Sequence, residues 1–387
     1  MNNSDFSNRG QSLIGQKMFS ILDQAIQYEK QGKTIKHLEL GEPDQYAPGR
    51  IINKTIISLL NHKVGYAPSG GLISLREGIA NYYSSAFNKD FKLNNVAISP
   101  ANMLIYQLLE ICSNTKDKVC IFTPGFPTYF AATQFINLNV KNIELDPSDG
   151  FQLTNTHVDQ AILENPKVIL VNSGNNPTGA VYKKEVLEYL VQKASENNIW
   201  VISDETYGML SFNKKYFSLL HSNYEKIAVL SSFSKVFSVP GYRVGYVISN
   251  STLIEKVILS SSTLYSCLPI FVQEGIEEGL NILDEFTEKR RSDYKKLGSE
   301  CIEILKKDNR ISCSMPDSGF YLFIDIRKLG IDDFSFCSKL LDSFGTALTP
   351  GSSFGFPGFV RACFCKDLNI VKSGLEDVVK FSKTLNN

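Results

Sequence analysis

The stretch "KVILVNSGNNPTGAVYKKEVLEYLVQKASENNIWVISDE" (residues 167–205) contains the repeating unit that decides the fold of this chain. It begins with a short apolar run, "KVILVN" (167–172), and ends with a second one, "WVISDE" (200–205). Between them, "KEVLEYLVQKASENN" (184–198) has apolar residues at three- and four-residue spacing, which is typical of an amphipathic helix. Two strands without polar alternation, joined by a helix, predict parallel strands that are buried on both faces.

The same rhythm continues on both sides of this unit. The further strand-like runs are "NVAIS" (95–99), "KVCIFTP" (118–124), "VKNIELD" (140–146), "KIAVLSS" (226–232) and "RVGYVIS" (243–249). Together with the first two runs they predict an α/β fold, in which a mainly parallel seven-stranded sheet is sandwiched by helices. We assign this large domain to residues 45–270.

The pattern changes from about residue 269. A long helical stretch predicts one long helix or a broken pair, and it is followed by strand-like "GFYLFIDI" (319–326) and "FVRACFC" (359–365). A final amphipathic helix is expected over 367–385. We therefore predict a smaller α+β domain made of residues 1–44 with 271–387, in which an N-terminal helix around Met18 to Lys30 packs.

Composition excludes several classes of function. The 387 residues include 40 basic and 40 acidic side chains, and a net charge of zero argues against a nucleic-acid or acidic-membrane partner. No apolar run is long enough to span a bilayer, and the polar N-terminus does not resemble a secretion signal. The eight cysteines are scattered without a CxxC pair and the four histidines lie far apart, so we predict no metal site and expect a reducing cytoplasm.

The unusual residues of the chain follow the predicted strands. The carboxyl ends of parallel strands meet at one edge of a sheet, where ligands bind. "SSFSKVFSVPGYRVGY" (231–246) carries only two charges, Lys235 and Arg243, and we expect both to be buried there. "NSGNNPTG" and "SDETYG" follow neighbouring runs, so Asn176 and Asp204 are expected to face the same cleft.

Each of these residues also has a purely structural interpretation. Asn176 favours a turn, Asp204 can cap a helix, and Tyr207 and Phe126 can be ordinary core residues. Lys235 is the hardest to explain in this way, because burying an ammonium group without a partner is costly. Its pKa should fall, which makes it a candidate nucleophile or base.

A lysine amine in a cleft can condense with an aldehyde to form an imine, and pyridoxal 5′-phosphate uses this chemistry. In this hypothesis Asp204 keeps the pyridine nitrogen protonated, Tyr207 and Asn176 donate to the phenolate oxygen, and Phe126 stacks on the ring. The phosphate needs an anion site of its own. Candidates for it are the Arg243 guanidinium, the hydroxyls of Ser232 and Ser234, and the amides of the helix that begins at Ala101 and Asn102.

These pieces, in this order and spacing, resemble the class I/II aminotransferases of the fold-type I pyridoxal-phosphate enzymes over nearly the whole chain. The matching segments are "LELGEPD" (38–44), "GYAPSGGLISLREGIANYY" (65–83), "PGFPTY" (124–129), "NNPTG" (175–179), "SDETY" (203–207), "SFSKVFSVPGYRVGY" (232–246) and "FVRACF" (359–364). The resemblance implies a ping-pong transfer of an amino group from an L-amino acid to a 2-oxo acid through an imine at Lys235. It also implies that Arg361, with Asn176 and the backbone of Gly41, binds the substrate carboxylate. Tyr66 would reach the phosphate of the other subunit in a homodimer with shared active sites.

The substrate is less constrained. Asn102 is neutral where some aspartate-specific relatives carry lysine, and residues 260–270 contain no arginine. Met18, Phe19 and Tyr265 are candidates to line an apolar pocket, so we expect a neutral or aromatic amino donor. Two rival hypotheses remain open: a pyridoxal-phosphate lyase or cyclising enzyme with the same residues, and a cofactor-binding regulator. The regulator is disfavoured because only about forty residues precede "GEPD".

Overall fold

A seven-stranded sheet forms the centre of the computed structural model, which describes residues 5–11, 13–14, 19–44 and 46–385. Its strands lie in the order β2-β8-β7-β6-β5-β3-β4. They are β2 (Val96–Ser99), β3 (Lys118–Thr123), β4 (Asn139–Glu144), β5 (Val168–Val171), β6 (Trp200–Asp204), β7 (Ile227–Ser232) and β8 (Gly245–Ile248). β8 is antiparallel to both of its neighbours, and the other neighbouring pairs are parallel. The predicted mainly parallel sheet is confirmed.

This strand order brings the functional loops to one edge. β2 and β7 run in the same direction because each is antiparallel to β8. The carboxyl ends of β2, β3, β5, β6 and β7 therefore open on the same side of the sheet. Gly245 makes the close fit at β8 possible, since a Cβ there would lie 2.9 Å from both Ala101 N and Ser99 O.

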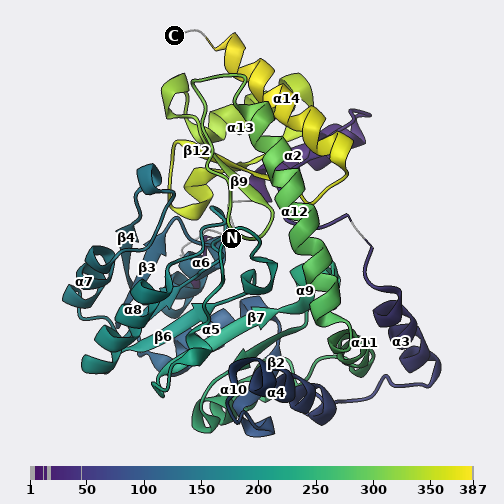
Figure 1. The fold of residues 1–387 in the computed structure, drawn as a ribbon, viewed down its shortest axis with the longest axis vertical. Helices are drawn as coiled ribbons and strands as arrows, with labels where there is room; N and C mark the ends of the chain where they lie inside the picture. The colour runs from purple at the N-terminus through teal and green to yellow at the C-terminus, as the bar shows by residue number, and fades with distance from the viewer. Residues whose placement is uncertain (1–4, 12, 15–18, 45, 386–387) are drawn as a thin grey trace.

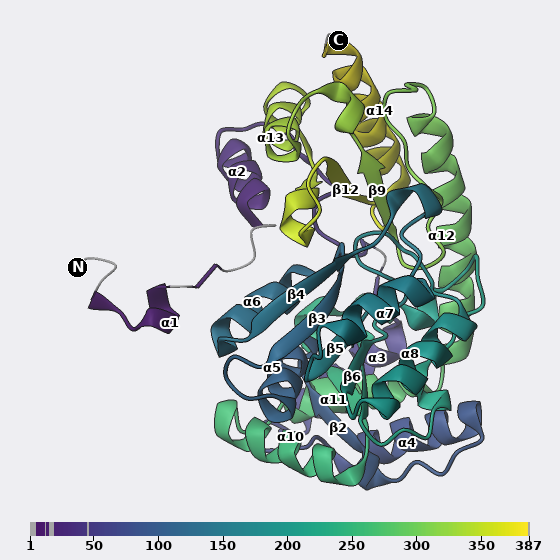
Figure 2. The same cartoon turned by 90° about the vertical axis from the view of Figure 1, so that its left-hand side faces the viewer.

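Helices cover both faces of the sheet (Figures 1 and 2). One face carries α5 (Ala101–Cys112), α6 (Pro127–Ile136) and α10 (Ser251–Leu264). The other carries α4 (Ile73–Phe87), α7 (Asn155–Leu163) and α8 (Lys184–Glu196). The four residues of β5 are all buried, as an apolar run without alternation predicts.

A second, antiparallel sheet lies across the open edge of the first one. It has the order β11 (Thr349–Pro350), β12 (Phe359–Cys363) and β9 (Tyr321–Asp325), and it is flanked by α13 (Asp333–Phe344) and α14 (Leu368–Thr384). The short β1 (Lys36–His37) pairs in parallel with β10 (Thr346–Ala347). α2 (Phe19–Lys30) contacts α13 and β10, which confirms the expected packing from Phe19 onward, while Met18 lies outside the described residues.

The predicted long helix is a broken pair, α11 (Ile270–Leu280) and α12 (Leu283–Leu305). α11 packs on α3 (Gly49–Leu60) and α4, whereas α12 runs from there to α14 beside the second sheet (Figure 1). The short helices are α1 (Asn8–Gln11) and α9 (Phe233–Val236). The division into residues 45–270 and 1–44 with 271–387 stays a prediction. The prediction assigns α11 to the smaller domain, yet α11 packs on α3 and α4, and α12 continues from there to the second sheet.

Candidate active site

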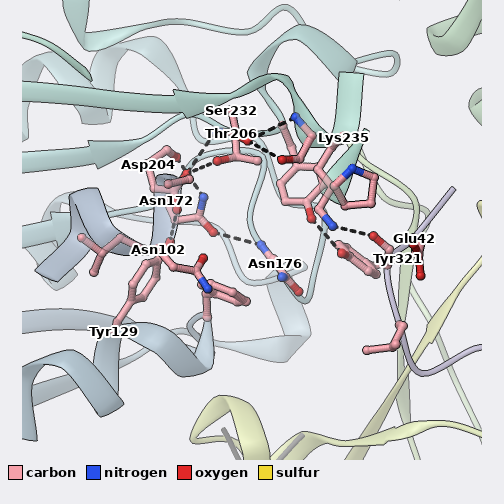
Figure 3. Close-up of a pocket in the computed structure, with 18 of the residues that line it drawn as sticks. Glu42, Asn102, Tyr129, Asn172, Asn176, Asp204, Thr206, Ser232, Lys235 and Tyr321 are labelled. Atoms are coloured by element: carbon pink, nitrogen blue, oxygen red, sulfur yellow. Dashed lines mark hydrogen bonds between the residues drawn. The ribbon is translucent and has the colours of Figure 1, made fainter. Parts of the chain in front are cut away.

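A cavity of about 280 Å³ lies between the open edge of the large sheet and the second sheet. Of the residues predicted to bind the cofactor or the substrate carboxylate, all except Tyr66 line it: Gly41, Ala101, Asn102, Phe126, Asn176, Asp204, Tyr207, Ser232, Ser234, Lys235, Arg243 and Arg361. Figure 3 shows the labelled residues of this cavity, among them Asp204, Lys235 and Tyr321, gathered around one space. The topology therefore brings together residues that are up to 320 positions apart (Gly41 and Arg361).

Lys235 lies in α9, directly after β7. Ser232 caps the start of this helix, and its hydroxyl accepts a hydrogen bond of 3.2 Å from the backbone N–H of Ser234. The Lys235 ammonium donates to the carbonyl oxygen of Gly41 at 2.6 Å. Burial lowers the pKa of Lys235 to about 8, so a larger fraction of this amine is neutral near physiological pH than for an exposed lysine.

Asp204 is a buried carboxylate at the end of β6. One oxygen accepts a hydrogen bond of 2.7 Å from the Tyr129 hydroxyl, and the other accepts from the hydroxyl and the backbone N–H of Thr206 at 2.7 and 3.0 Å. Burial raises the pKa of Asp204, and these three donors oppose that rise. No ion pair joins Asp204 to a cation among the described residues, so the carboxylate can accept a cationic group from a ligand.

Arg361, on β12, is a fully buried cation with one unsatisfied donor. One terminal nitrogen donates to Asn176 Oδ1 at 2.9 Å, and the other donates to Glu39 O and to Thr349 Oγ1. Its Nε has no hydrogen-bond partner in the described part of the chain. A buried donor without a partner is costly, so a ligand with an anionic oxygen would complete this group.

The mouth of the cavity differs from the prediction in one respect. Lys235 is partly buried, but Arg243 is exposed. Arg243 follows a 3₁₀ turn over Pro240–Tyr242 at a positive φ of 60°, and its guanidinium donates to Pro240 O at 2.9 Å. The sequence predicted burial because only apolar and hydroxyl side chains surround it, whereas this turn carries it to the rim. α5 starts nearby without a side-chain cap, so its first amides remain available to an anion.

Some predicted pocket residues lie elsewhere. Tyr66 is 90% exposed on the loop after α3 and does not line the cavity. Tyr265 does not line it either, because its hydroxyl donates to Ser261 within α10. Phe19 lines the cavity as expected, together with Leu40 and Ile105.

Comparison with known proteins places this geometry in a family. Residues 41–375 match the family model for aminotransferase class I and II. An aspartate aminotransferase of Thermotoga maritima is 30% identical over 91% of this chain and 92% of its own length. A (5-formylfuran-3-yl)methyl phosphate transaminase of Methanocaldococcus jannaschii is 31% identical over 94% of this chain and 96% of its own length. The solved Thermotoga maritima aspartate aminotransferase superposes with a TM-score of 0.91 at 30% identity, covering 97% of this chain and 99% of that one.

The chain belongs to the class I and II aminotransferases. It is a pyridoxal-phosphate-dependent transferase that moves an amino group between an amino acid and a 2-oxo acid. No helix in the described part of this aminotransferase is long and apolar enough to cross a membrane.

The residues of the cavity fit the cofactor of this aminotransferase. A pyridine nitrogen that carries a proton suits Asp204, which is buried and has no cationic partner among the residues that the structure describes. An aldehyde suits the amine of Lys235, whose pKa is lowered. A phosphate suits the rim, where Arg243 and the first turn of α5 lie on the same cavity. One cavity therefore offers a separate partner for each functional end of the cofactor.

Sequence reasoning missed several residues of the aminotransferase cavity. Tyr129 and Thr206 donate hydrogen bonds to Asp204. Both lie in segments in which other residues were predicted to act, "PGFPTY" (124–129) and "SDETY" (203–207). Asn172 donates to Asp204 O and accepts from Asn176 N, each at 2.9 Å, and its place directly after β5 was a usable signal. Tyr321 had no signal, because it is an aromatic residue at the start of an apolar strand.

Proposed function

We propose that this aminotransferase transfers the amino group of an L-amino acid with an uncharged side chain, and that Lys235 is the residue that carries its cofactor. One observation supports the proposal most strongly. Three groups line the same cavity: a lysine with a lowered pKa, and a buried carboxylate and a buried arginine Nε that have no cationic partner and no hydrogen-bond partner, respectively, in the described part of the chain.

In this proposal the chain holds the cofactor at both ends. Lys235 binds the aldehyde carbon and Asp204 the pyridine nitrogen, while Phe126 covers the ring. Arg243 and the residues of the cavity rim hold the phosphate: Ser232, Ser234, Ala101 and Asn102. When bound, pyridoxal phosphate supplies an electron sink for negative charge at the substrate α-carbon.

Two donors would serve the phenolic oxygen of the ring. Tyr207 offers its hydroxyl, and Asn176 offers its amide nitrogen because its oxygen already accepts from Arg361. Such bonds favour the ionised form of that oxygen. Asn176 would thereby connect the cofactor to the cation that binds the substrate.

Arg361 would bind the substrate carboxylate and so fix the direction of the α-C–H bond. Its guanidinium already donates hydrogen bonds to Asn176 Oδ1 and Glu39 O. Little side-chain conformational entropy is therefore lost when the substrate binds. Lys235, once free, is the base that takes the α-proton. A pKa of about 8 suits this task at neutral pH, because the amine is neutral in an appreciable fraction and still basic.

The substrate class follows from the cations of the cavity. Among the described residues that line it, these are Lys235, Arg243 and Arg361, and each already has a role in the proposal. A second substrate carboxylate would have no further cation to pair with among these residues. The apolar side chains of Phe19, Leu40 and Ile105 instead favour an uncharged or aromatic side chain.

A homodimer is part of the proposal. α3 buries Ile51 and Thr55 against α11, yet its other face exposes apolar residues. The loop that follows it carries the exposed Tyr66. A large apolar surface of this kind is typical of a subunit interface. In a homodimer Tyr66 would reach the phosphate site of the partner.

We also propose a cytoplasmic location. The eight cysteines are all free thiols, and six of them are buried. Five of these six lie in five different helices or strands. Free thiols are typical of proteins that work in a reducing compartment.

The decisive experiment mixes the purified, cofactor-loaded protein with single amino acids in the absence of any 2-oxo acid. We expect leucine, methionine or phenylalanine to convert the cofactor to its amino form, and aspartate to do so at least tenfold more slowly. Faster conversion by aspartate would refute the substrate class but not transamination. Release of ammonia without an acceptor would indicate a lyase instead.

The Lys235→Ala variant tests the role of the lysine. We expect borohydride reduction to leave the cofactor attached to the wild-type peptide but not to the variant, and turnover to fall by several orders of magnitude. The mass of the peptide that contains residue 235 is the measurement. A variant that still retains the cofactor covalently after reduction would contradict the assignment.

A further inference from the structure

Tyr321 contacts Tyr207 and Arg361, two of the groups that the proposed function uses, and it lies close to Gly41. It is buried at the start of β9, and its hydroxyl lies 2.7 Å from that of Tyr207. The centre of its ring lies 4.3 Å from the guanidinium carbon of Arg361. A Cβ at Gly41 would lie 1.9 Å from the Tyr321 hydroxyl, so the segment that holds the Lys235 amine is fitted around this phenol.

The hydrogen bond between the two phenols can run in either direction. Burial raises the pKa of both hydroxyls, so each carries its proton at neutral pH. If Tyr207 donates to the cofactor oxygen, its single proton is committed there. Only Tyr321 can then donate within the pair. A phenol that accepts a hydrogen bond is polarised and becomes a better donor itself.

The ring of Tyr321 has a second contact. It lies against one face of the Arg361 guanidinium, while Phe354 lies 4.8 Å from the same carbon. Such packing restricts the plane of the guanidinium and keeps water away from it, and a desolvated cation–π contact contributes to holding the cation. The hydroxyl and the ring of Tyr321 therefore act on two different groups.

We propose that Tyr321 is a positioning residue of the transamination site: its hydroxyl directs the proton of Tyr207 to the cofactor oxygen, and its ring fixes Arg361 for the substrate carboxylate. This inference rests on the proposed function. It adds a residue of the second sheet that contacts both Tyr207, which would bind the cofactor, and Arg361, which would bind the substrate carboxylate.

Two substitutions separate the two contacts. Tyr321→Phe removes the hydroxyl and keeps the ring, and Tyr321→Leu removes both. In Tyr321→Phe we expect the pKa seen in the absorbance of the bound cofactor to rise by roughly 0.5–1 unit, because Tyr207 becomes a weaker donor. KM for the amino acid should hardly change. In Tyr321→Leu we expect the same rise in pKa and, in addition, an increase of about tenfold in KM.

The double variant Tyr207→Phe/Tyr321→Phe shows whether the effect passes through Tyr207. We expect the cofactor pKa of the double variant to equal that of Tyr207→Phe alone. Tyr182→Phe is the matched control, because Tyr182 is a buried phenol outside the cavity whose hydroxyl has no partner among the described residues. It should leave the cofactor pKa unchanged.

The inference would be overturned by an unchanged cofactor pKa in Tyr321→Phe, or by a shift that adds to that of Tyr207→Phe. Normal turnover of the wild type would in either case leave the proposed function standing. A wild-type protein that binds no cofactor would instead refute the proposed function. Binding of pyridoxal phosphate to each apoprotein, followed by fluorescence, identifies a variant that has lost its fold. If Tyr321→Leu has lost its fold, Tyr321→Phe still tests the inference, because it lacks only the hydroxyl oxygen.

Discussion

At the scale of single residues, the cavity holds two ionisable groups, Lys235 and Asp204, that form no ion pair within the described part of the chain. Among the described residues, Lys235 has only a carbonyl oxygen as its hydrogen-bond partner, and Asp204 has only hydroxyl and amide donors. Each group is therefore less stable in its charged form than it would be in water. In the proposed function, a bound cofactor would remove this penalty at both residues.

The stability of the apoprotein should reveal the penalty at Lys235. The folded pKa of about 8 lies below the ordinary value of 10.5, so the unfolded chain binds more protons between these pH values. Wild-type stability therefore gains from this residue as the pH rises from 8 to 10.5. The free energy of unfolding of Lys235→Met minus that of the wild type should be largest below pH 8 and decrease above it. Urea denaturation of both apoproteins at pH 7.5, 8.5 and 9.5 measures this, and a constant difference would contradict it.

Tyr129 should set the acidic limb of the activity profile. Its hydroxyl donates to Asp204, and the loss of one donor to a buried carboxylate raises the pKa of that carboxylate. In Tyr129→Phe we expect the acidic limb of kcat/KM to move to higher pH by about one unit. Steady-state rates between pH 5 and 9 provide the measurement, with Tyr182→Phe as the control. Identical profiles for Tyr129→Phe and the wild type would rule out this role.

At the scale of elements, short strands support the walls of the cavity. β1 has two residues, and the chain after it runs through Glu39, whose carbonyl oxygen accepts from Arg361. His37 anchors this strand, because its ring nitrogens lie 2.7 Å from Glu39 Oε1 and 3.2 Å from Glu29 Oε1. The hydrogen bond to Glu39 is the largest of the effects that raise the pKa of His37 to about 9.

The contribution of His37 to stability should depend on pH. Because its folded pKa is raised above 6.5, the contribution is complete below pH 6.5 and is lost as the pH rises through 9. We expect His37→Gln to lower the free energy of unfolding by about 1–2 kcal/mol at pH 6, a value reduced for partial solvent exposure, and by little at pH 9.5. Thermal unfolding at the two pH values tests this. Equal losses at both would show that the charge on His37 is not involved.

At the scale of the whole molecule, α12 connects the two sheets (Figure 1), and the cavity lies between these sheets. Arg361 and Tyr321, on the second sheet, line the cavity together with the proposed cofactor-binding residues at the strand ends of the first. Tyr66 is exposed and does not line this cavity, and several apolar residues of α3 are also exposed. A second copy of the chain would cover both.

Charge substitutions on that surface should separate the proposed dimer. We expect Ile57→Lys/Leu60→Lys to shift the monomer–dimer equilibrium by at least about tenfold, because both exposed side chains would have to be buried as ammonium groups. Activity should fall with dissociation. Leu163→Lys is the control, since Leu163 is 85% exposed at the end of α7, far from α3 in Figure 1. Sedimentation velocity measures the outcome, and a monomeric wild type would contradict the prediction.

Much of the fold follows from local sequence patterns. All seven runs without polar alternation form strands of the large sheet, because an apolar β-branched segment of this length needs burial on both faces. The residues that follow these strands line one cavity, since parallel strands end at a common edge. Lys235 and Asp204 could therefore be placed near each other from the sequence alone.

Only the tertiary structure decided the rest. Tyr321 reaches Tyr207 across 114 positions and Tyr129 reaches Asp204 across 75, and no local pattern specifies such contacts. The insertion of β8 between β2 and β7 and the exposure of Arg243 at a left-handed turn likewise depend on how distant segments pack. Periodicity and turn chemistry act over a few residues, whereas strand order and the partners of a buried hydroxyl are set by the closure of the whole chain.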